Sequence, residues 1–264
     1  MFKLEKYYNK SFDRQTFWED KYAQEHIVGS SSVEFKKQGF WPLLQSSLTK
    51  DGKRYLDVGC GIGGWILFLK EEGYTVEGVD VAARTVRALT EYDPDLKVKV
   101  ASMTALPYED NSMDGVLAIG TLEYVEDKVA VAIAEVARAV KPGGLFFLEV
   151  PMANLLRRLT YIPMKKLEKI VRLWLGHEPA FSNYLFNRVE LRRLLEEGGF
   201  EVTEERVHEL PEPASHYGLY IDFPIFRGRE QYKLNWLGRF VKTVLNAISP
   251  WIASTGMVVI AKKK

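Results

Sequence analysis

The sequence is poor in cysteine and histidine: its 264 residues include one cysteine, Cys60, and four histidines. A single cysteine cannot close an intramolecular disulfide, and scarce cysteine is typical of a reducing compartment, so we expect a cytoplasmic location. These residues also lack the spacing that brings metal ligands together, so we expect no metal site. The scarcity excludes a disulfide-stabilised scaffold and argues against a metalloenzyme.

Long hydrophobic runs, internal repeats and low-complexity tracts are missing as well. No run approaches the roughly 18 apolar residues that a membrane span needs, and the opening MFKLEKYYNK mixes charges where a signal peptide is apolar. The whole sequence is 47% hydrophobic and 27% charged, with a net charge of +1. This balance is typical of a folded globular protein.

From residue 54 onward, short apolar runs alternate with amphipathic stretches. We expect strands at 54–58, 75–79, 97–101, 113–119, 145–150, 200–207 and 257–261. We expect helices at 65–72, 83–92, 128–140 and 187–197, a basic helix at 164–175, a turn at 176–179 and an amphipathic stretch at 234–248. Strands that alternate with helices predict βαβ units, and therefore an α/β fold with a doubly wound parallel sheet.

The changes of rhythm divide the chain into segments. Residues 1–50 are predicted to form a helical N-terminal cap, and residues 51–151 the cofactor-binding core. Residues 152–186 are predicted to be a lid insertion. Residues 187–264 are predicted to complete the sheet, with a second cover insertion at 208–255.

The stretch YLDVGCGIGGWILFL, residues 55–69, places four glycines in six positions between two apolar runs. Glycine permits positive φ and close backbone approach, so this strand, turn and helix start can bring backbone N–H groups to a ligand. Asp80 ends the second strand, 21 residues after Gly59, where a carboxylate can accept both hydroxyls of a ribose. An adenosyl ligand and NAD both need such an acid.

Asp57 discriminates between an adenosyl ligand and NAD. It lies two residues before Gly59, where a carboxylate repels a pyrophosphate and attracts a cationic amino group. S-adenosylmethionine carries such an amino group and no phosphate. The alternative role for Asp57 is to stabilise a turn or cap a helix. The alternative functions for the protein are an NAD(P)-dependent oxidoreductase and a non-catalytic adenosyl-binding module at a membrane surface.

Five segments resemble, in order, the motifs of the class I S-adenosylmethionine-dependent methyltransferases, in particular the type 11-like members. LDVGCGIGG is similar to their first motif and VEGVD to the second, and both ALPYEDNSMDGVLAIGTLEYVED and EVARAVKPGGLFFLEVP match their later strands and helix. LRRLLEEGGFEV with GMVVIAKKK resembles their terminal helix and last two strands. The resemblance implies a seven-stranded, mostly parallel sheet whose last strand is antiparallel, and S-adenosylmethionine as the cofactor.

The resemblance also implies a set of cofactor-binding residues: Asp57, Gly59, Cys60, Gly61, Gly63, Asp80, Val81, Ser102, Met103, Ile119, Gly120 and Thr121. In this assignment Asp80 holds the ribose, Val81 lies against the adenine, and Ser102 edges it. Family members often have an aspartate where this chain has Ser102. Tyr124 stands where many have a histidine near the reacting methyl group.

Catalysis needs little from the side chains, because a sulfonium methyl group is already activated and its transfer mainly requires alignment and desolvation. The candidate bases are Tyr124, His177 and His216. For each histidine, a surface or packing role is the simpler interpretation.

The acceptor is predicted from charge. The segment between residues 154 and 176 contains one acid, Glu168, and six basic residues: Arg157, Arg158, Lys165, Lys166, Lys169 and Arg172. This excess favours a small-molecule acceptor that is anionic, or contact with a membrane surface, and its simplest alternative is a solvated exterior. We expect Trp174, Trp236 and Trp251 to contact the core. No RNA-binding motif is present, so we do not expect nucleic acid to bind.

Overall fold

The structure is a computed structural model that describes residues 1–8, 14–23, 32–209, 224–226, 228 and 234–264. The chain divides into two compact units. The sheet unit comprises residues 11–149, 192–204 and 259–264, and the accessory unit comprises residues 1–10, 150–191 and 205–258.

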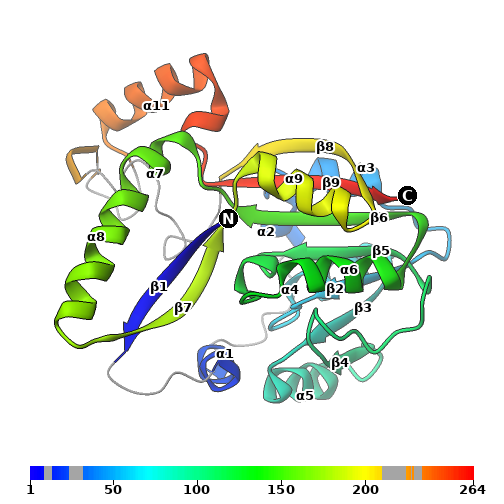
Figure 1. Ribbon diagram of the computed structural model, residues 1–264. Helices are drawn as coiled ribbons and strands as arrows, with labels where there is room; N and C mark the ends of the chain where they lie inside the picture. The colour runs from blue at the N-terminus through cyan, green and yellow to red at the C-terminus, as the bar shows by residue number, and fades with distance from the viewer. Residues whose placement is uncertain (9–13, 24–31, 210–223, 227, 229–233) are drawn as a thin grey trace. The chain divides into compact units, whose positions relative to one another are not determined.

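A seven-stranded sheet has the order β4-β3-β2-β5-β6-β9-β8 (Figure 1). Its strands are β2 (Arg54–Val58), β3 (Thr75–Asp80), β4 (Val98–Val100), β5 (Met113–Ile119), β6 (Val140–Pro151), β8 (Phe200–His208) and β9 (Gly256–Lys263). Strand β2 pairs in parallel with β3 and β5, and β5 pairs in parallel with β6. Strand β9 runs antiparallel to them. The predicted seven-stranded α/β sheet is confirmed.

Helices follow the strands where apolar residues recur every three or four positions: α4 (Gly64–Glu71), α5 (Ala83–Tyr92), α6 (Val129–Ala139) and α9 (Arg188–Glu197). Helix α6 shows the principle, because Val129, Ala132, Ile133 and Val136 lie on one face and all are buried. The sheet needs this cover, since the middle of β5 is buried and apolar. Predicted ends at 54–58, 83–92 and 113–119 match the observed ones.

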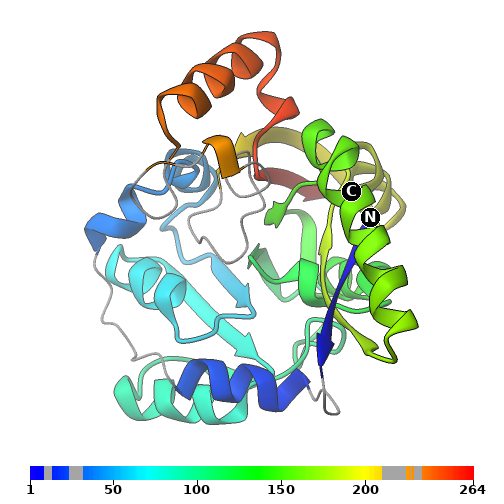
Figure 2. The ribbon, with the colours of Figure 1, turned by 90° about the vertical axis from the view of Figure 1, so that its left-hand side faces the viewer.

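Three short helices precede the sheet: α1 (Arg14–Ala23), α2 (Ser32–Lys36) and α3 (Trp41–Ser47). Helix α1 lies beside α5 (Figure 2), and Glu19 of α1 pairs with Arg84 of α5 at 3.3 Å. Helix α3 buries Trp41 and Leu44. These helices agree with the cap predicted for this part of the chain only in part, because its first residues are not helical.

Residues 2–8 form a strand, β1 (Phe2–Tyr8), which corrects the prediction that residues 1–50 are helical. Strand β1 pairs antiparallel with β7 (Glu178–Leu185), an unpredicted strand that takes up the second half of the turn predicted at 176–179. The sequence FKLE alternates apolar and polar residues, as strands do. Its partner lies about 180 residues away, so no local window reveals the pairing.

Helix α6 is shorter than predicted, because it ends at Ala139 and β6 begins at Val140. Pro142, Gly143 and Gly144 therefore lie within β6, where the pairing with β5 shifts register between Met113 and Gly115. Gly143 has a φ of +72°, which suits such an irregularity.

The accessory unit contains β1, β7, α7 (Leu155–Leu159), α8 (Tyr161–Trp174) and α11 (Trp236–Ile248). Helix α8 lies along β1 and β7, and its first turn buries Tyr161 and Ile162 in a small core with Leu185. Trp174 and Trp236 are 84% and 72% exposed, so the expectation that they contact the core is wrong. Their helices turn other faces inward.

Arg157 corrects a second expectation from the sequence, which counted it among the surface cations. It is fully buried, and its Nη1 donates hydrogen bonds to the carbonyl oxygens of Met152 and Thr255, at 2.7 and 2.8 Å. Its backbone N–H donates to the side chain of Asn154, which caps α7. Arg157 therefore connects α7 to the ends of two strands through hydrogen bonds, and its role is structural.

Within the described residues, no helix combines the length and apolar character needed to cross a membrane.

Candidate functional site

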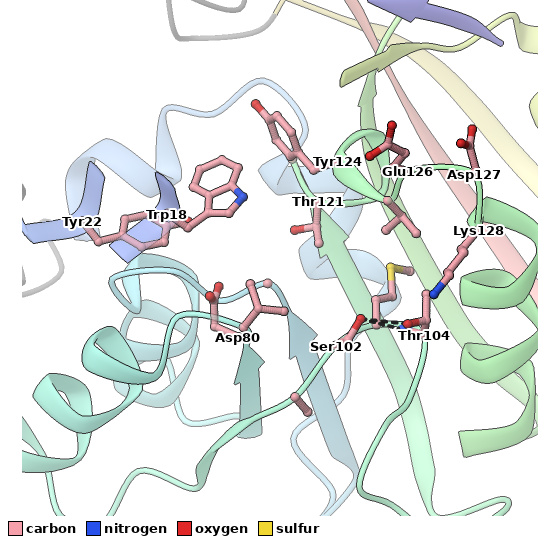
Figure 3. Close-up of a pocket in the computed structure, with 16 residues that line it drawn as sticks. Trp18, Tyr22, Asp80, Ser102, Thr104, Thr121, Tyr124, Glu126, Asp127 and Lys128 are labelled. Atoms are coloured by element: carbon pink, nitrogen blue, oxygen red, sulfur yellow. Dashed lines mark hydrogen bonds between the residues drawn. The ribbon is translucent and has the colours of Figure 1, made fainter. Parts of the chain in front are cut away.

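A pocket of about 550 Å³ opens at the carboxyl ends of β2, β3 and β5 (Figure 3). The described residues of its lining belong to the sheet unit: Trp18, Tyr22, Gly59, Asp80, Val81, Ala101, Ser102, Met103, Thr104, Gly120, Thr121, Tyr124, Val125, Glu126, Asp127 and Lys128. Strand order reverses between β2 and β5, the position where open α/β sheets bind ligands. The volume is that of a small-molecule site.

The glycine loop approaches two other segments too closely for side chains. Gly59 has a φ of +73°, and a Cβ built on it would lie 2.4 Å from Thr121 Oγ1. Gly61 has a φ of +50°, and its Cβ would lie 3.0 Å from Tyr22 Oη. The N–H groups of Gly59 and Cys60 both donate to the carbonyl oxygen of Val79, which fixes the loop on β3. Backbone conformation and space therefore both favour glycine at 59, and backbone conformation favours it at 61.

Asp80 is held by the loops on either side of it. Its Oδ2 accepts a hydrogen bond from the N–H of Gly61 and its Oδ1 from that of Ala82, each at 2.9 Å. Burial raises the pKa of this carboxyl, and the two amide hydrogen bonds act in the opposite direction. The carboxylate borders the pocket in a fixed orientation (Figure 3).

Asp57 lies on the neighbouring strand and is buried, with 3% of its surface exposed. Burial, and then the charge of Asp80, raise the pKa of Asp57 to about 7. Asp57 does not line the pocket. A cation bound near this pair of acids would lower both pKa values, so the pair favours a positively charged group.

The structure brings seven of the predicted cofactor residues together around the pocket: Gly59, Asp80, Val81, Ser102, Met103, Gly120 and Thr121. The other five are outside its described lining: Asp57, as noted above, and four more. Cys60 is buried against Gly78, and burial raises the pKa of its thiol. A Cβ on Gly63 would lie 2.4 Å from Leu89 Cδ2, so this glycine permits packing on α5. Gly61 contacts Tyr22, and Ile119 is the last residue of β5.

Ser102 is engaged within its own turn. Its Oγ accepts a hydrogen bond from the N–H of Thr104 at 3.2 Å and shares another with Thr104 Oγ1 at 2.9 Å (Figure 3). The hydroxyl that is predicted to edge the adenine therefore also holds the turn.

Three aromatic rings border the pocket together. Trp18 and Tyr22, from α1, stack with ring centroids 5.5 Å apart, and Trp18 meets Tyr124 edge to face at 4.8 Å. Tyr124 comes from the short 3-10 helix η1 (Leu122–Tyr124), which follows β5. No residue of α1 is among the site residues predicted from the sequence. The signal that the sequence contains is the i, i+4 spacing of Trp18 and Tyr22.

Neither histidine candidate is found among the described residues of this lining. His177 belongs to the accessory unit, in the turn between α8 and β7. His216 lies outside the described residues. Of the three predicted bases, Tyr124 is the one that the structure places at the pocket.

A buried pair of carboxyl groups, which the sequence analysis missed, lies behind Gly120. A Cβ on Gly120 would lie 3.8 Å from Glu149 Oε2 and 3.9 Å from Glu123 Oε1. Burial, and then the charge of Glu149, raise the pKa of Glu123 well above its usual value.

The fold places a glycine loop and an acid at the carboxyl ends of its central strands, as in nucleoside-binding α/β proteins. Residues 39–205 match the sequence model of a family described as a methyltransferase domain. The chain belongs to this family, the class I S-adenosylmethionine-dependent methyltransferases, whose cofactor is S-adenosylmethionine. The predicted family is confirmed, and neither predicted alternative is favoured.

Three comparisons illustrate the range of similarity. An S-adenosylmethionine-dependent methyltransferase from Methanosarcina mazei superposes with a TM-score of 0.59 at 25% identity, covering 84% of this chain and 97% of that one. A 2-methyl-6-phytyl-1,4-hydroquinone methyltransferase from Synechocystis is 40% identical over 98 residues, 36% of this chain and 30% of its own length. A ubiquinone biosynthesis O-methyltransferase from Paracidovorax citrulli is 39% identical over 102 residues, 36% of this chain and 42% of its own length. The chain thus matches less than half the length of these two curated relatives.

Proposed function

We propose that this chain transfers a methyl group from S-adenosylmethionine to a small-molecule acceptor. The observation that carries the proposal is Asp80, fixed by the amides of Gly61 and Ala82 at the border of a 550 Å³ pocket. A fixed carboxylate at this position suits the paired hydroxyls of a ribose.

The residues present fit the cofactor. Gly59 borders the pocket without a side chain, and Val81 and Met103 offer apolar surface for an adenine. Asp57, buried and close to Asp80, offers negative charge to an amino group. Bound there, S-adenosylmethionine supplies a methyl group activated by a sulfonium.

The chain's own contribution is to orient the reactants and exclude water. Trp18, Tyr22 and Tyr124 line the pocket with rings that contact one another, so they limit access of water. Alignment of two bound reactants is the main requirement of such a transfer. The Tyr124 hydroxyl is the proposed group to accept a hydrogen bond from the acceptor, and in its deprotonated form it would take the acceptor's proton.

The small-molecule class of the acceptor is supported by the pocket volume and by the names of relatives, which refer to hydroquinone, ubiquinone and phosphoethanolamine chemistry. An anionic acceptor remains a prediction from the basic residues of 154–176. The described lining contains the cation of Lys128 and three acids, Asp80, Glu126 and Asp127. The lining alone therefore favours a neutral or cationic acceptor.

Calorimetric titration tests the cofactor part of the proposal. We expect S-adenosylmethionine and its demethylated product to bind and NAD to give no heat. Asp80→Asn should weaken binding by about tenfold to a hundredfold, because a charge-assisted hydrogen bond contributes roughly 1.5–3 kcal/mol. The matched control is Asp95→Asn, which changes an exposed acid in the same unit. Heat with NAD and none with the adenosyl ligands would contradict the proposal.

The acceptor class is tested by incubating the chain with methyl-tritiated S-adenosylmethionine and a cell extract that has been fractionated by size. We expect label in the small-molecule fraction, and less of it with Asp80→Asn. Label confined to the protein or nucleic acid fraction would overturn the small-molecule class while leaving methyl transfer in place.

A further inference from the structure

Helix α8 presents its apolar side chains to solvent. Leu167, Ile170 and Trp174 follow the spacing of one helix face, and they are 62%, 64% and 84% exposed. Three more apolar side chains on or beside this face are about half exposed: Met164, Val171 and Leu175. A stripe of this size on a surface marks an interaction site.

The opposite face of α8, which carries the charges, is the better covered one. Lys165 and Glu168 are 26% and 34% exposed and pair at 2.6 Å. The Lys165 ammonium lies 5.7 Å from the ring of Tyr161, and that of Lys166 lies 6.0 Å from the ring of Phe2 on β1. Helix α8 therefore turns its charged face toward β1 and β7 and its apolar face outward, the reverse of an ordinary surface helix.

Helix α11 repeats this arrangement. Trp236, Phe240, Val244 and Ile248, spaced by four residues, are between 43% and 72% exposed. Gly238, on another side of the helix, is buried, and a Cβ there would lie 2.8 Å from the carbonyl oxygen of Phe226. The accessory unit thus displays two separate apolar stripes.

Charge indicates what these stripes contact. Helix α8 carries four basic residues and one acid, and α11 carries two basic residues, Arg239 and Lys242, and no acid. Lysine and arginine beside an apolar stripe can place their stems along hydrocarbon and their charges at a polar, anionic layer. An anionic lipid bilayer offers both.

The tryptophans occupy helix ends. Trp174 is the last residue of α8 and Trp236 the first of α11. Tryptophan favours the boundary between hydrocarbon and headgroups, because its ring is apolar and its N–H is polar. This placement favours a bilayer over a protein partner, for which no such boundary exists.

We propose that the outward faces of α8 and α11 form a docking surface for an anionic lipid bilayer. The surface is defined by Leu167, Ile170, Trp174, Trp236, Phe240 and Val244. It goes beyond the proposed methyl transfer and does not depend on it.

Vesicle flotation of the full chain tests this proposal without cofactor or acceptor. We expect the chain to float with vesicles of phosphatidylcholine mixed with phosphatidylglycerol, and to float less with phosphatidylcholine alone. Added salt should release part of the bound chain, since it screens the cationic component. Equal partition into both vesicle types would overturn the anionic part of the proposal.

Two triple variants test the stripes: Leu167→Ser with Ile170→Ser and Trp174→Ser, and Trp236→Ser with Phe240→Ser and Val244→Ser. Each should lower partition at least about tenfold, because it removes most of one apolar stripe that the bilayer would bury. The control is Tyr92→Ser with Val131→Ser and Val189→Ser, which replaces apolar residues that are similarly exposed on other helices.

Circular dichroism confirms that each variant keeps its fold, and light scattering gives its oligomeric state. Parent-like partition by both stripe variants would overturn the proposal. So would a parent that ignores vesicles but forms a dimer that the stripe variants dissociate, because the stripes would then bind a second copy of the chain.

Discussion

The two units orient similar helices in opposite ways. In the sheet unit, α6 buries Ile133 completely, whereas in the accessory unit α8 leaves Ile170 64% exposed. Both residues belong to stripes with the spacing of a helix face. The spacing of apolar residues therefore determines that a helix has an apolar stripe. The sheet that the helix packs on determines whether this stripe faces inward or outward.

The partners differ in size. Helix α6 covers a seven-stranded sheet whose parallel strands are apolar on both faces, so the sheet needs an apolar cover. Helix α8 lies on a two-stranded ladder and uses only its first turn, Tyr161 and Ile162, in a shared core. A two-stranded ladder offers too little surface to bury a helix of 14 residues.

The largest expected effect comes from shortening one isoleucine in each unit. Ile133→Ala should lower the free energy of unfolding by about 4 kcal/mol, because it leaves a cavity among fully buried side chains. Ile170→Ala should change it by less than about 0.5 kcal/mol, because an exposed side chain loses little. Urea unfolding measures both, and equal losses would mean that α8 is buried in solution.

A pair of glycines gives the next largest contrast. Gly59→Ala should cost about 3 kcal/mol, since it combines positive φ with a Cβ 2.4 Å from Thr121 Oγ1. Gly176→Ala in the accessory unit also has positive φ, but no atom lies within 4 Å of its Cβ, so it should cost about 1 kcal/mol. Thermal unfolding of the two variants compares these costs. A Gly59→Ala variant as stable as Gly176→Ala would show that the loop moves away from Thr121.

The sheet unit was the more predictable of the two because its signals are local. Apolar runs, glycine turns and helix spacing fixed the strand at 54–58 and the helix at 83–92 within windows of about ten residues. Asp57, Gly59 and Asp80 could be placed for the same reason, since each ends or follows a recognisable strand.

What could not be predicted depends on contacts distant in sequence. Phe2 pairs with Leu185, and no window contains both. Trp18 reaches the pocket because α1 packs beside α5, and the outward face of α8 follows from the small ladder beneath it. Spacing alone carries no information on either.

Asp57 provides a pH-dependent contrast inside the sheet unit. Its pKa is raised to about 7 in the folded chain, above the ordinary value of 3.8. Between these values the unfolded chain loses the proton that the folded chain keeps, so stability falls as pH rises from about 4 to about 7. Asp57→Asn should remove roughly 2–3 kcal/mol of that fall between pH 5 and pH 8.

Urea unfolding of the parent and Asp57→Asn across this pH range measures the difference. The subtraction isolates Asp57 from His208, whose pKa is lowered to about 4 by burial and whose contribution therefore rises with pH. Parallel stability curves for parent and variant would contradict the raised pKa.

The smallest expected effect concerns Ser102, in the pocket of the sheet unit. Ser102→Asp should strengthen S-adenosylmethionine binding by on the order of 1 kcal/mol, because a carboxylate is a stronger acceptor for an amino group. An aspartate can also accept from the N–H of Thr104, as Ser102 does now, so the turn should persist. Calorimetry compares Ser102→Asp with Ser102→Asn, which has the same shape without the charge and should bind like the parent. The serine triple variant of α8 should bind the cofactor like the parent too, because the described lining of the pocket contains no residue of the accessory unit. Weaker binding by Ser102→Asp with an unchanged melting temperature would place the adenine elsewhere in the pocket.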